Sequence, residues 1–439
     1  MGRAEGVGPL GGLSPAERRV LAAVDDLSDE MVRFCQALVQ VPTVNPPGER
    51  YPECAQLIGE KLADLGYSVE YVAGEGRPEH TRAHPRVNVV GRMEGQMARP
   101  CLHFNGHFDV VPVGDGWTVD PFGGELRGGK IYGRGACDQK AGIAASIFGV
   151  EAIRRAGVKL RGTVEQSATV DEESGGYAGV ADLCDRGVFS ADRQDHVIIT
   201  EPLNHDRVCI GHRGVYWFEV TTHGRIGHGS MPDYGVNAAD LMAEFIHAVN
   251  NELRPRLRQR TTSMPVAPEM ARHATINLNA LHGGQEMGGE GFLASCVADR
   301  CVAVYDRRFL EEEKLAEVKS EIVALLEEVG RRNDRFRYTL RDLWSVPPVA
   351  TPSDAQVVNV VRDAVHDVIG QPATLVASPG TYDHKHIALR AGIVECIAYG
   401  PGILDLAHVP DEYVEVHHLV TSAKVMALAT MRLVGTERG

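Results

Sequence analysis

Long hydrophobic runs are absent from this sequence. No stretch approaches the ~18 uninterrupted apolar residues that a membrane-spanning helix requires. The N-terminal segment also lacks the apolar core of a secretory signal, and Gly6 stands where a myristoylation motif requires Ser or Thr. We therefore expect a protein with no membrane partner.

Positive charge is scarce relative to negative charge. The chain has 45 Lys and Arg against 59 Asp and Glu, which gives a formal net charge of −14 at pH 7. Such a balance provides no electrostatic footprint for nucleic acid or for an anionic membrane. We therefore expect a small-molecule substrate and no nucleic-acid partner.

Cysteine pairs with metal-binding spacing are also missing. The nine cysteines form an odd number and include no CxxC, so they indicate neither a disulfide framework nor a thiolate zinc site. A reducing compartment fits this pattern, and the predicted location is cytoplasmic.

The sequence does contain an ordinary globular composition over 439 residues, about three times the ~150 residues of a typical domain. Its first half alternates short β-branched runs with longer helical patterns, which is typical of an α/β sheet. The patterns predict helices at 29–65 and 140–156, and strands at 86–90, 101–108, 164–170 and 196–200.

A different pattern begins near Gly211. Strand patterns at 215–222, 274–281, 296–305 and 335–340 and helical patterns at 238–253 and 311–330 follow the order of a ferredoxin-like unit. The α/β pattern then returns, with a helix at 353–369 and strands near Thr374 and at 394–398. The prediction is an α/β domain at 1–212 and 345–439, with a central mixed sheet flanked by helices, split by an inserted ferredoxin-like α+β domain at 213–344.

Two polar side chains end an apolar run in the segment HFNGHFD, residues 103–109. His107 and Asp109 are two residues apart, so an extended backbone points both to the same face. A carboxylate beside an imidazole commonly fixes the tautomer of a metal-bound histidine. The alternative is that His107 only closes the end of a strand.

Asp138 lies in a Gly-rich segment, GRGACDQK, immediately before an Ala-rich helical pattern. An aspartate at this place serves either as a helix N-cap or as a ligand at the site. A phosphate-binding loop is excluded, because the segment lacks the spacer and the Lys-Ser/Thr of a P-loop.

Further acidic residues follow predicted strands. Glu172 and Glu173 come after one strand and Glu201 after the next, at the edge where open α/β sheets place their sites. Side-chain alternation would send Glu172 and Glu173 in different directions, which suits one base and one ligand; a solvated acidic turn is the alternative. Together with His408 in a later loop, this set of oxygen and nitrogen donors can hold two divalent ions.

Seven segments resemble, in their order and intervals, the M20 family of dinuclear zinc amidohydrolases: HFNGHFD, GRGACDQKAG, TVDEESGG, Glu201-Pro202, GRIGHGSMP, SPGTYDHKH and AHVPDE. That family includes acetylornithine deacetylase, succinyl-diaminopimelate desuccinylase, aminoacylase and carboxypeptidase G2. The resemblance implies a homodimer in which the inserted domain is the dimerisation (lid) domain. It also implies two divalent metal ions per chain, with Zn²⁺ expected and Co²⁺ or Mn²⁺ as alternatives.

Carried over by position, the resemblance implies five metal ligands: His107, Asp138, Glu173, Glu201 and His408. Asp138 would bridge the two ions, with His107 and Glu201 on one and the remaining two ligands on the other. Asp109 would orient His107. Glu172 would be the general base that takes a proton from a water bridging the metals, which leaves a hydroxide.

The resemblance also implies contacts with the substrate. His228 is similar to a histidine that reaches the active site of the partner subunit and polarises the scissile carbonyl. Arg308 matches an arginine for the substrate carboxylate, with an ion pair to Asp306 as the alternative. Gly380 and Thr381 match a contact with the substrate backbone.

The expected function is metal-dependent hydrolysis of a C–N amide bond, above all deacylation of an N-acyl amino acid or a related small carboxylate-bearing amide. The alternatives are a metallo-dipeptidase or aminopeptidase and a hydrolase of an aromatic amide or amine. A metal-free binding protein is a remote alternative, because the ligand set is intact. Ser295 and Cys296 stand near the place of an expected substrate-binding asparagine, and no asparagine precedes His408 in its loop. These departures argue against succinyl-diaminopimelate as the substrate.

Overall fold

The computed structural model describes residues 12–284 and 295–437, which group into two compact units. The first unit contains the described residues up to Gly211, those from Thr351 to Val376, and those from Tyr382 onward. The second contains the described residues of His212–Ala350 together with Ala377–Thr381. No helix in the described part of the chain has the length and apolarity needed to span a bilayer.

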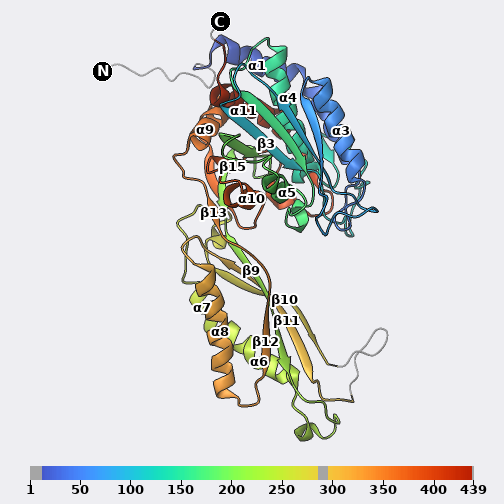
Figure 1. The fold of residues 1–439 in the computed structure, drawn as a ribbon, viewed down its shortest axis with the longest axis vertical. Coiled ribbons are helices and arrows are strands. Elements are labelled where there is room, and N and C mark those ends of the chain that lie inside the picture. The colour runs from blue at the N-terminus through green and yellow to red at the C-terminus, as the bar shows by residue number, and fades with distance from the viewer. Residues whose placement is uncertain (1–11, 285–294, 438–439) are drawn as a thin grey trace, which may run out of the picture. The chain divides into compact units, whose positions relative to one another are not determined.

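A mixed sheet forms the centre of the first unit (Figure 1). Its strands follow the order β1 (Ser68–Ala73), β2 (Val87–Met93), β6 (Thr163–Thr169), β3 (Cys101–His107), β7 (His196–Ile199), β15 (Cys396–Ala398) and β8 (Arg207–His212). Strands β6, β3, β7 and β15 run parallel, whereas β1, β2 and β8 pair antiparallel with their neighbours. Every residue of β3 and β6 is buried, as expected for strands that are covered on both faces.

Helices flank this sheet. Helix α3 (Tyr51–Asp64) packs on β1 and β2, while α4 (Ala141–Arg155) and α11 (Val416–Val434) pack together and on β3. The outer helices α1 (Pro15–Asp26), α2 (Ser28–Val39) and α9 (Gln356–Ile369) cover this pair, and α5 (Val180–Asp185) packs against α10 (His384–Leu389). Small residues allow α4 and α11 to approach closely: a Cβ added at Gly149 would lie 2.7 Å from the carbonyl oxygen of Ala423.

A small sheet in the first unit joins two distant segments. It consists of β4 (Glu125–Arg127), β5 (Lys130–Tyr132) and β16 (Tyr413–Glu415), in the order β16-β5-β4. Tyr413 pairs with Tyr132 in this antiparallel ladder. The segment that leads to Asp138 therefore lies beside the segment that follows His408.

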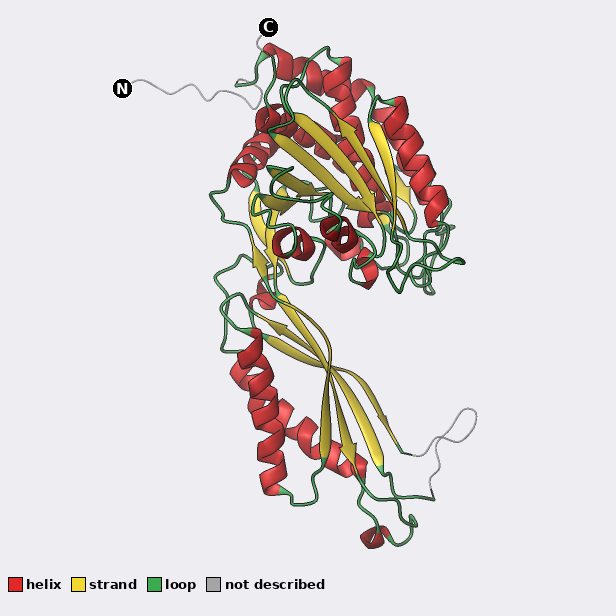
Figure 2. Ribbon diagram, in the orientation of Figure 1, coloured by secondary structure: helices red, strands yellow, loops and turns green. Residues whose placement is uncertain are grey.

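The second unit is a layer of strands with helices on one face (Figure 2). Its strand order is β10 (Thr275–Gly283), β11 (Arg300–Phe309), β9 (Gly214–His223) and β12 (Tyr338–Val346), with every pair antiparallel. Strand β11 buries every second residue, which is the pattern of a sheet with one covered face. Helices α6 (Ala238–Ala248) and α8 (Leu315–Arg332) form the core with the strands, and α7 (Arg254–Leu257) is short. Two further strands, β13 (Val349–Ala350) and β14 (Thr374–Ser378), lie in the sequence where the chain passes between the units.

The predicted fold class is confirmed, because a mixed α/β sheet and a ferredoxin-like strand and helix order are both present. The single helix predicted at 29–65 is wrong. Helices α2 and α3 are separate, and the segment 40–50 between them carries Pro42, Pro46 and Pro47, which cannot continue an α-helix. The strand predicted at 296–305 begins instead at Arg300 and runs to Phe309.

Candidate metal centre

The predicted ligands and the predicted base of the first unit gather at one edge of its sheet. His107 is the last residue of β3, Glu172 and Glu173 follow β6, and Glu201 follows β7. Strands β3, β6 and β7 are parallel neighbours, so their carboxyl ends share one edge. Asp138 and His408 approach this edge from loops outside the sheet, where they contact His107 and Glu173.

His107 is fixed through both ring nitrogens. Its Nδ1 lies 3.0 Å from the backbone carbonyl oxygen of Asp109 and 3.4 Å from the Asp109 carboxylate. Its Nε2 lies 3.2 Å from Oδ1 of Asp138. With Nδ1 held by Asp109, the Nε2 lone pair is the one directed at the centre, which is the arrangement expected of a metal-ligating histidine.

Asp138 lies between two histidines. Its Oδ1 faces His107, and its Oδ2 lies 3.4 Å from Nε2 of His408. The residue has non-helical backbone angles and precedes α4 in an irregular turn, Ala136–Lys140. Helix α4 has no side-chain cap, so Asp138 does not act as its N-cap. A carboxylate that presents one oxygen to each of two histidines has the geometry of a bridging ligand.

The alternation expected for Glu172 and Glu173 requires an extended backbone, but these residues do not continue the extended backbone of β6. They lie in a short 3₁₀ turn after Asp171, whose φ is +62°. The Asp109 carboxylate accepts both backbone N–H groups of the turn at 3.1 Å and a further hydrogen bond from Asn45 at 2.9 Å. Asp109 therefore positions both the turn and His107. Asn45, which holds the Asp109 carboxylate, was not predicted from the sequence.

The two glutamates of this turn nevertheless face different partners. Oε1 of Glu173 lies 3.0 Å from Nε2 of His408. Oε2 of Glu172 lies 4.0 Å from Nε2 of His107, with no hydrogen bond between them. Glu173 is therefore paired with a predicted ligand, whereas Glu172 stands close to the centre without being bound to it.

Glu201 completes the side of the centre occupied by His107. Its Oε1 lies 4.0 Å from Nε2 of His107 and accepts a hydrogen bond of 2.8 Å from the Gln139 amide. Gln139 also accepts a hydrogen bond from Thr200. The Gln139 amide orients Glu201. The position of Gln139 directly after Asp138 in the sequence is the signal that could have identified this residue.

Burial disfavours the charged form of every carboxylate in the centre. It raises the pKa of Glu172 to about 8, and it also raises the pKa values of Glu173 and Glu201. Although burial acts in the opposite direction, hydrogen bonds with His107 and His408 lower the pKa of Asp138. Contacts with Asp138 and Glu173 raise the pKa of His408 to about 10. The centre thus places four carboxylates against two histidines, His107 and His408.

Divalent cations fit this set of donors. One donor atom each from His107, Asp138 and Glu173 lie within 4.8 Å of one another. Carboxylate oxygens and imidazole nitrogens are suitable ligands for divalent metals, and a bound cation would offset the excess of buried carboxylates. The site can therefore hold divalent metal.

A buried ion pair connects the two ligand loops that lie outside the sheet. The Glu412 carboxylate accepts three backbone N–H bonds of 2.9–3.0 Å from the segment 135–138. Arg134 donates to Glu412 at 2.6 Å and to the backbone carbonyl oxygen of His408 at 3.3 Å. No role for this pair could be predicted from the sequence, although Glu412 belongs to the AHVPDE segment.

Four predicted residues belong to the second unit. His228 is exposed, and its Nδ1 accepts hydrogen bonds from the backbone and hydroxyl of Ser230. Arg308 donates to both oxygens of Asp306 at 2.8 and 2.9 Å, which is the alternative that the sequence left open. Gly380 and Thr381 are half-buried. The roles assigned to these four residues at the centre stay predictions.

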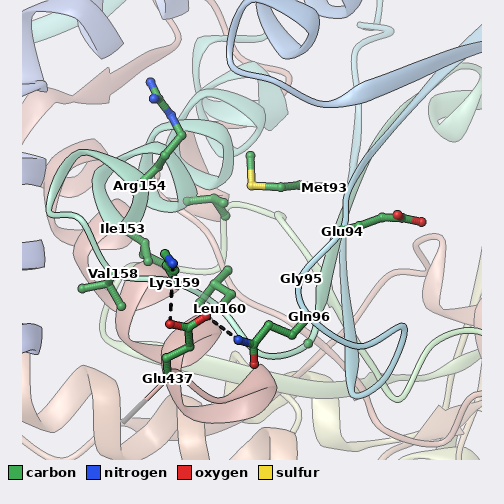
Figure 3. Close-up of a pocket in the computed structure, with 12 residues that line it drawn as sticks. Met93, Glu94, Gly95, Gln96, Ile153, Arg154, Val158, Lys159, Leu160 and Glu437 are labelled. Carbon is green, nitrogen blue, oxygen red and sulfur yellow. Dashed lines mark hydrogen bonds and ion pairs between the residues drawn. The ribbon is translucent and has the colours of Figure 1, made fainter. Parts of the chain in front are cut away.

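A separate cavity of about 350 Å³ lies at the other end of the central strands. It is lined by residues from the end of β2, the approach to β6 and helix α4, and Figure 3 shows Glu437 paired with Gln96 and Lys159 on its wall. None of its lining residues belongs to the predicted centre.

Comparisons with known proteins identify the family and the fold of this chain. Residues 103–432 match the peptidase family M20/M25/M40. The succinyl-diaminopimelate desuccinylase of Variovorax paradoxus is 28% identical over 408 residues, which cover 92% of this chain and 97% of the relative. In fold, the chain resembles an M20 family metallo-carboxypeptidase from Sulfolobus solfataricus, with a TM-score of 0.73, 18% identity and coverage of 92% and 99%.

A second solved structure also has this fold. It is the YXEP protein of Bacillus subtilis, a dinuclear metal binding peptidase of the M20 family, with a TM-score of 0.67, 15% identity and coverage of 93% and 99%. The family match spans most of the chain and includes all five predicted metal ligands and Glu172. The chain therefore belongs to peptidase family M20/M25/M40 and is a metal-dependent hydrolase of C–N amide bonds.

Proposed function

We propose that the first unit binds two Zn²⁺ ions and deacylates a carboxylate-bearing N-acyl amino acid. The observation that carries this proposal is the position of Asp138 between His107 and His408, at 3.2 and 3.4 Å. Glu201 faces His107, and Glu173 faces His408. This arrangement supports one ion on each side of Asp138.

Each side of the centre would hold one ion through a histidine, a glutamate and the shared aspartate. When bound, the ions supply Lewis acidity and a water molecule whose pKa lies far below that of bulk water. This donor set contains no cysteine, unlike most closed structural zinc sites. It therefore favours a catalytic role for the metals.

Glu172 is the proposed general base. Its side chain is 10% exposed and lies 4.0 Å from Nε2 of His107 without a hydrogen bond to it, so the carboxylate is available to the attacking water. Glu172 takes a proton from this water as the oxygen attacks the amide carbonyl. It then gives the proton to the departing nitrogen, which leaves as an amine while the acyl group leaves as a carboxylic acid.

Asp109 and Gln139 contribute by orientation. Asp109 holds His107 and the two amides of the Glu172 turn, and Gln139 holds Glu201. Hydrogen bonds of this kind keep reacting groups in a productive geometry. Neither residue needs to exchange a proton with the substrate.

We also propose a homodimer assembled through residues 213–344. In this arrangement His228 of each chain polarises the scissile carbonyl at the other chain's centre and stabilises the oxyanion that forms. His228 is exposed, and Ser230 is the only hydrogen-bond partner of its imidazole among the described residues, which supports this role. The odd number of cysteines, all of them free, supports a cytoplasmic location.

Substrate recognition is proposed to involve residues of the second unit. Arg308, Gly380 and Thr381 are the proposed contacts, with the Arg308 guanidinium binding the substrate carboxylate in place of Asp306. A planar guanidinium suits bidentate binding of a carboxylate. The relative from Variovorax paradoxus is a succinyl-diaminopimelate desuccinylase. N-succinyl-diaminopimelate therefore belongs among the substrates to be tested, although the expected asparagines are absent.

A turnover panel tests the proposed function. The protein is assayed with N-succinyl-diaminopimelate, N-acetyl amino acids, dipeptides and aryl amides, each with added Zn²⁺, Co²⁺ or Mn²⁺. We expect the highest kcat/KM with an N-acyl amino acid. Preference for dipeptides with a free α-amine, or for aryl amides without a carboxylate, would refute the substrate class while leaving the metal centre intact.

A further inference from the structure

Lys385 is a buried lysine next to the proposed base. Its side chain is only 2% exposed, and its Nζ lies 3.9 Å from Oε1 of Glu172. An ammonium group is costly to bury without a negative partner. Glu172 is the carboxylate that lies within ion-pair distance of the Lys385 Nζ among the described residues, and the buried carboxylate of Asp383 also interacts electrostatically with Lys385.

The two oxygens of Glu172 face in different directions. Oε2 faces His107 of the centre at 4.0 Å, and Oε1 faces Lys385 at 3.9 Å. The backbone N–H of Glu172 is held separately by Asp109. The lysine is thus placed to fix the outer oxygen of the side chain while the inner oxygen is directed at the centre.

The segment that carries Lys385 is docked on the Glu172 turn by other contacts. The next residue, His386, has Nε2 at 2.7 Å from the backbone carbonyl oxygen of Gly175. A Cβ added at Gly176 would lie 2.5 Å from Oδ1 of Asp383, so this close approach requires glycine. Lys385 therefore reaches Glu172 from the amino-terminal end of α10, which packs directly on the Glu172 turn.

We propose that Lys385 is a positioning residue for the hydrolysis, and that its buried ammonium group orients the Glu172 carboxylate toward the metal centre. This inference rests on the proposed function, in which Glu172 is the base. Lys385 acts through Glu172 and is not itself assigned a contact with the substrate.

A double-mutant cycle tests this inference, with Lys385→Met and Glu172→Gln made singly and together. Kinetics use the panel substrate that the wild-type enzyme hydrolyses fastest. We expect Lys385→Met to retain metal and to lower kcat by about 10–100-fold, the range for residues that orient catalytic groups, with KM changed by less than about 3-fold. In the Glu172→Gln background the same substitution should lower kcat by less than about 2-fold, because the group it orients is already inactive. Lys385→Arg, which keeps the charge, should recover most of the lost kcat.

The urea midpoint of unfolding provides a readout that needs no substrate. Lys385→Met should lower the midpoint of the metal-loaded wild-type protein by more than twice the shift that it causes in the Glu172→Gln background. Lys140→Met is the matched control, because Lys140 is also buried but its Nζ donates to the carbonyl oxygens of Leu38 and Val41. Its shift should be the same in both backgrounds.

The outcomes separate this inference from the proposed function. Equal effects of Lys385→Met in both backgrounds, in kcat or in urea midpoint, would overturn the role of Lys385. A loss of bound metal in Lys385→Met would also overturn it. If the wild-type protein hydrolyses no panel substrate, the proposed function fails, and the urea cycle alone decides whether Lys385 and Glu172 are coupled.

Discussion

Replacement of Glu172 by glutamine separates catalysis from metal binding. The amide has nearly the same shape as the carboxylate, and the turn that carries it is held by backbone N–H groups that the substitution leaves in place. The Glu172 side chain makes no hydrogen bond to a predicted ligand, its nearest ligand nitrogen being 4.0 Å away. We therefore expect Glu172→Gln to retain both metals.

The size of the kinetic effect follows from the loss of the proton acceptor. General acid–base catalysis contributes ~10²–10⁴-fold, which corresponds to about 3–5 kcal/mol of transition-state stabilisation at ~1.36 kcal/mol per tenfold change. Because the base acts only in the reaction, kcat should fall by this factor while KM changes little. The assay is steady-state turnover of the best panel substrate, accompanied by metal analysis of the same preparation.

Two further substitutions provide the controls for this prediction. Glu173→Gln removes the carboxylate that lies 3.0 Å from His408, so it should weaken metal binding on that side. Glu70→Gln changes an exposed residue of β1 and should have no effect on either quantity. A Glu172→Gln protein that loses metal, with a Glu173→Gln protein that keeps it, would show that the two glutamates have been assigned the wrong way round.

Three further predictions concern pH, assembly and substrate charge. In the metal-free protein the folded-state pKa of Glu172 is about 8 against an ordinary 4.5, so the folded state binds this proton more tightly than the unfolded state. The melting temperature should therefore fall as pH rises between those values, and metal loading should flatten this profile. A metal-free melting temperature that rises with pH would contradict the raised pKa of Glu172. Mixed inactive chains of His228→Ala and Glu172→Gln should regain activity if His228 acts across a dimer, and no recovery despite proven subunit exchange would refute that assembly. Arg308→Ala should impair carboxylate-bearing substrates by ~2–4 kcal/mol in kcat/KM and their uncharged analogues much less; equal losses would mean that Arg308 serves only its pair with Asp306.

Much of the centre could be predicted because its residues lie at strand ends. His107, Glu172 and Glu201 each close or follow an apolar strand pattern, and parallel neighbours bring such ends to one edge. Asp138 and His408 could be named as candidate ligands from the sequence, but their places on the two ions followed only from the resemblance, since both lie in irregular segments outside the sheet. The ion pair between Arg134 and Glu412 that connects these loops joins residues far apart in the chain, and no local pattern shows such a contact.

Local backbone geometry set the limit for the rest. The alternation of side chains expected for Glu172 and Glu173 fails because Asp171 adopts a positive φ and turns the chain into a 3₁₀ segment. No role for Lys385 could be predicted from the SPGTYDHKH segment, because a lysine is usually at the surface. Its burial depends on how α10 docks on the Glu172 turn, which is a tertiary contact.

The metal content of active protein tests the central claim most directly. Protein purified without chelator is analysed for divalent metals, stripped, and assayed again as metal is returned. We expect close to two ions per chain, loss of amide hydrolysis on stripping, and recovery that follows reoccupation of the centre. A stripped protein that retains full activity would contradict it.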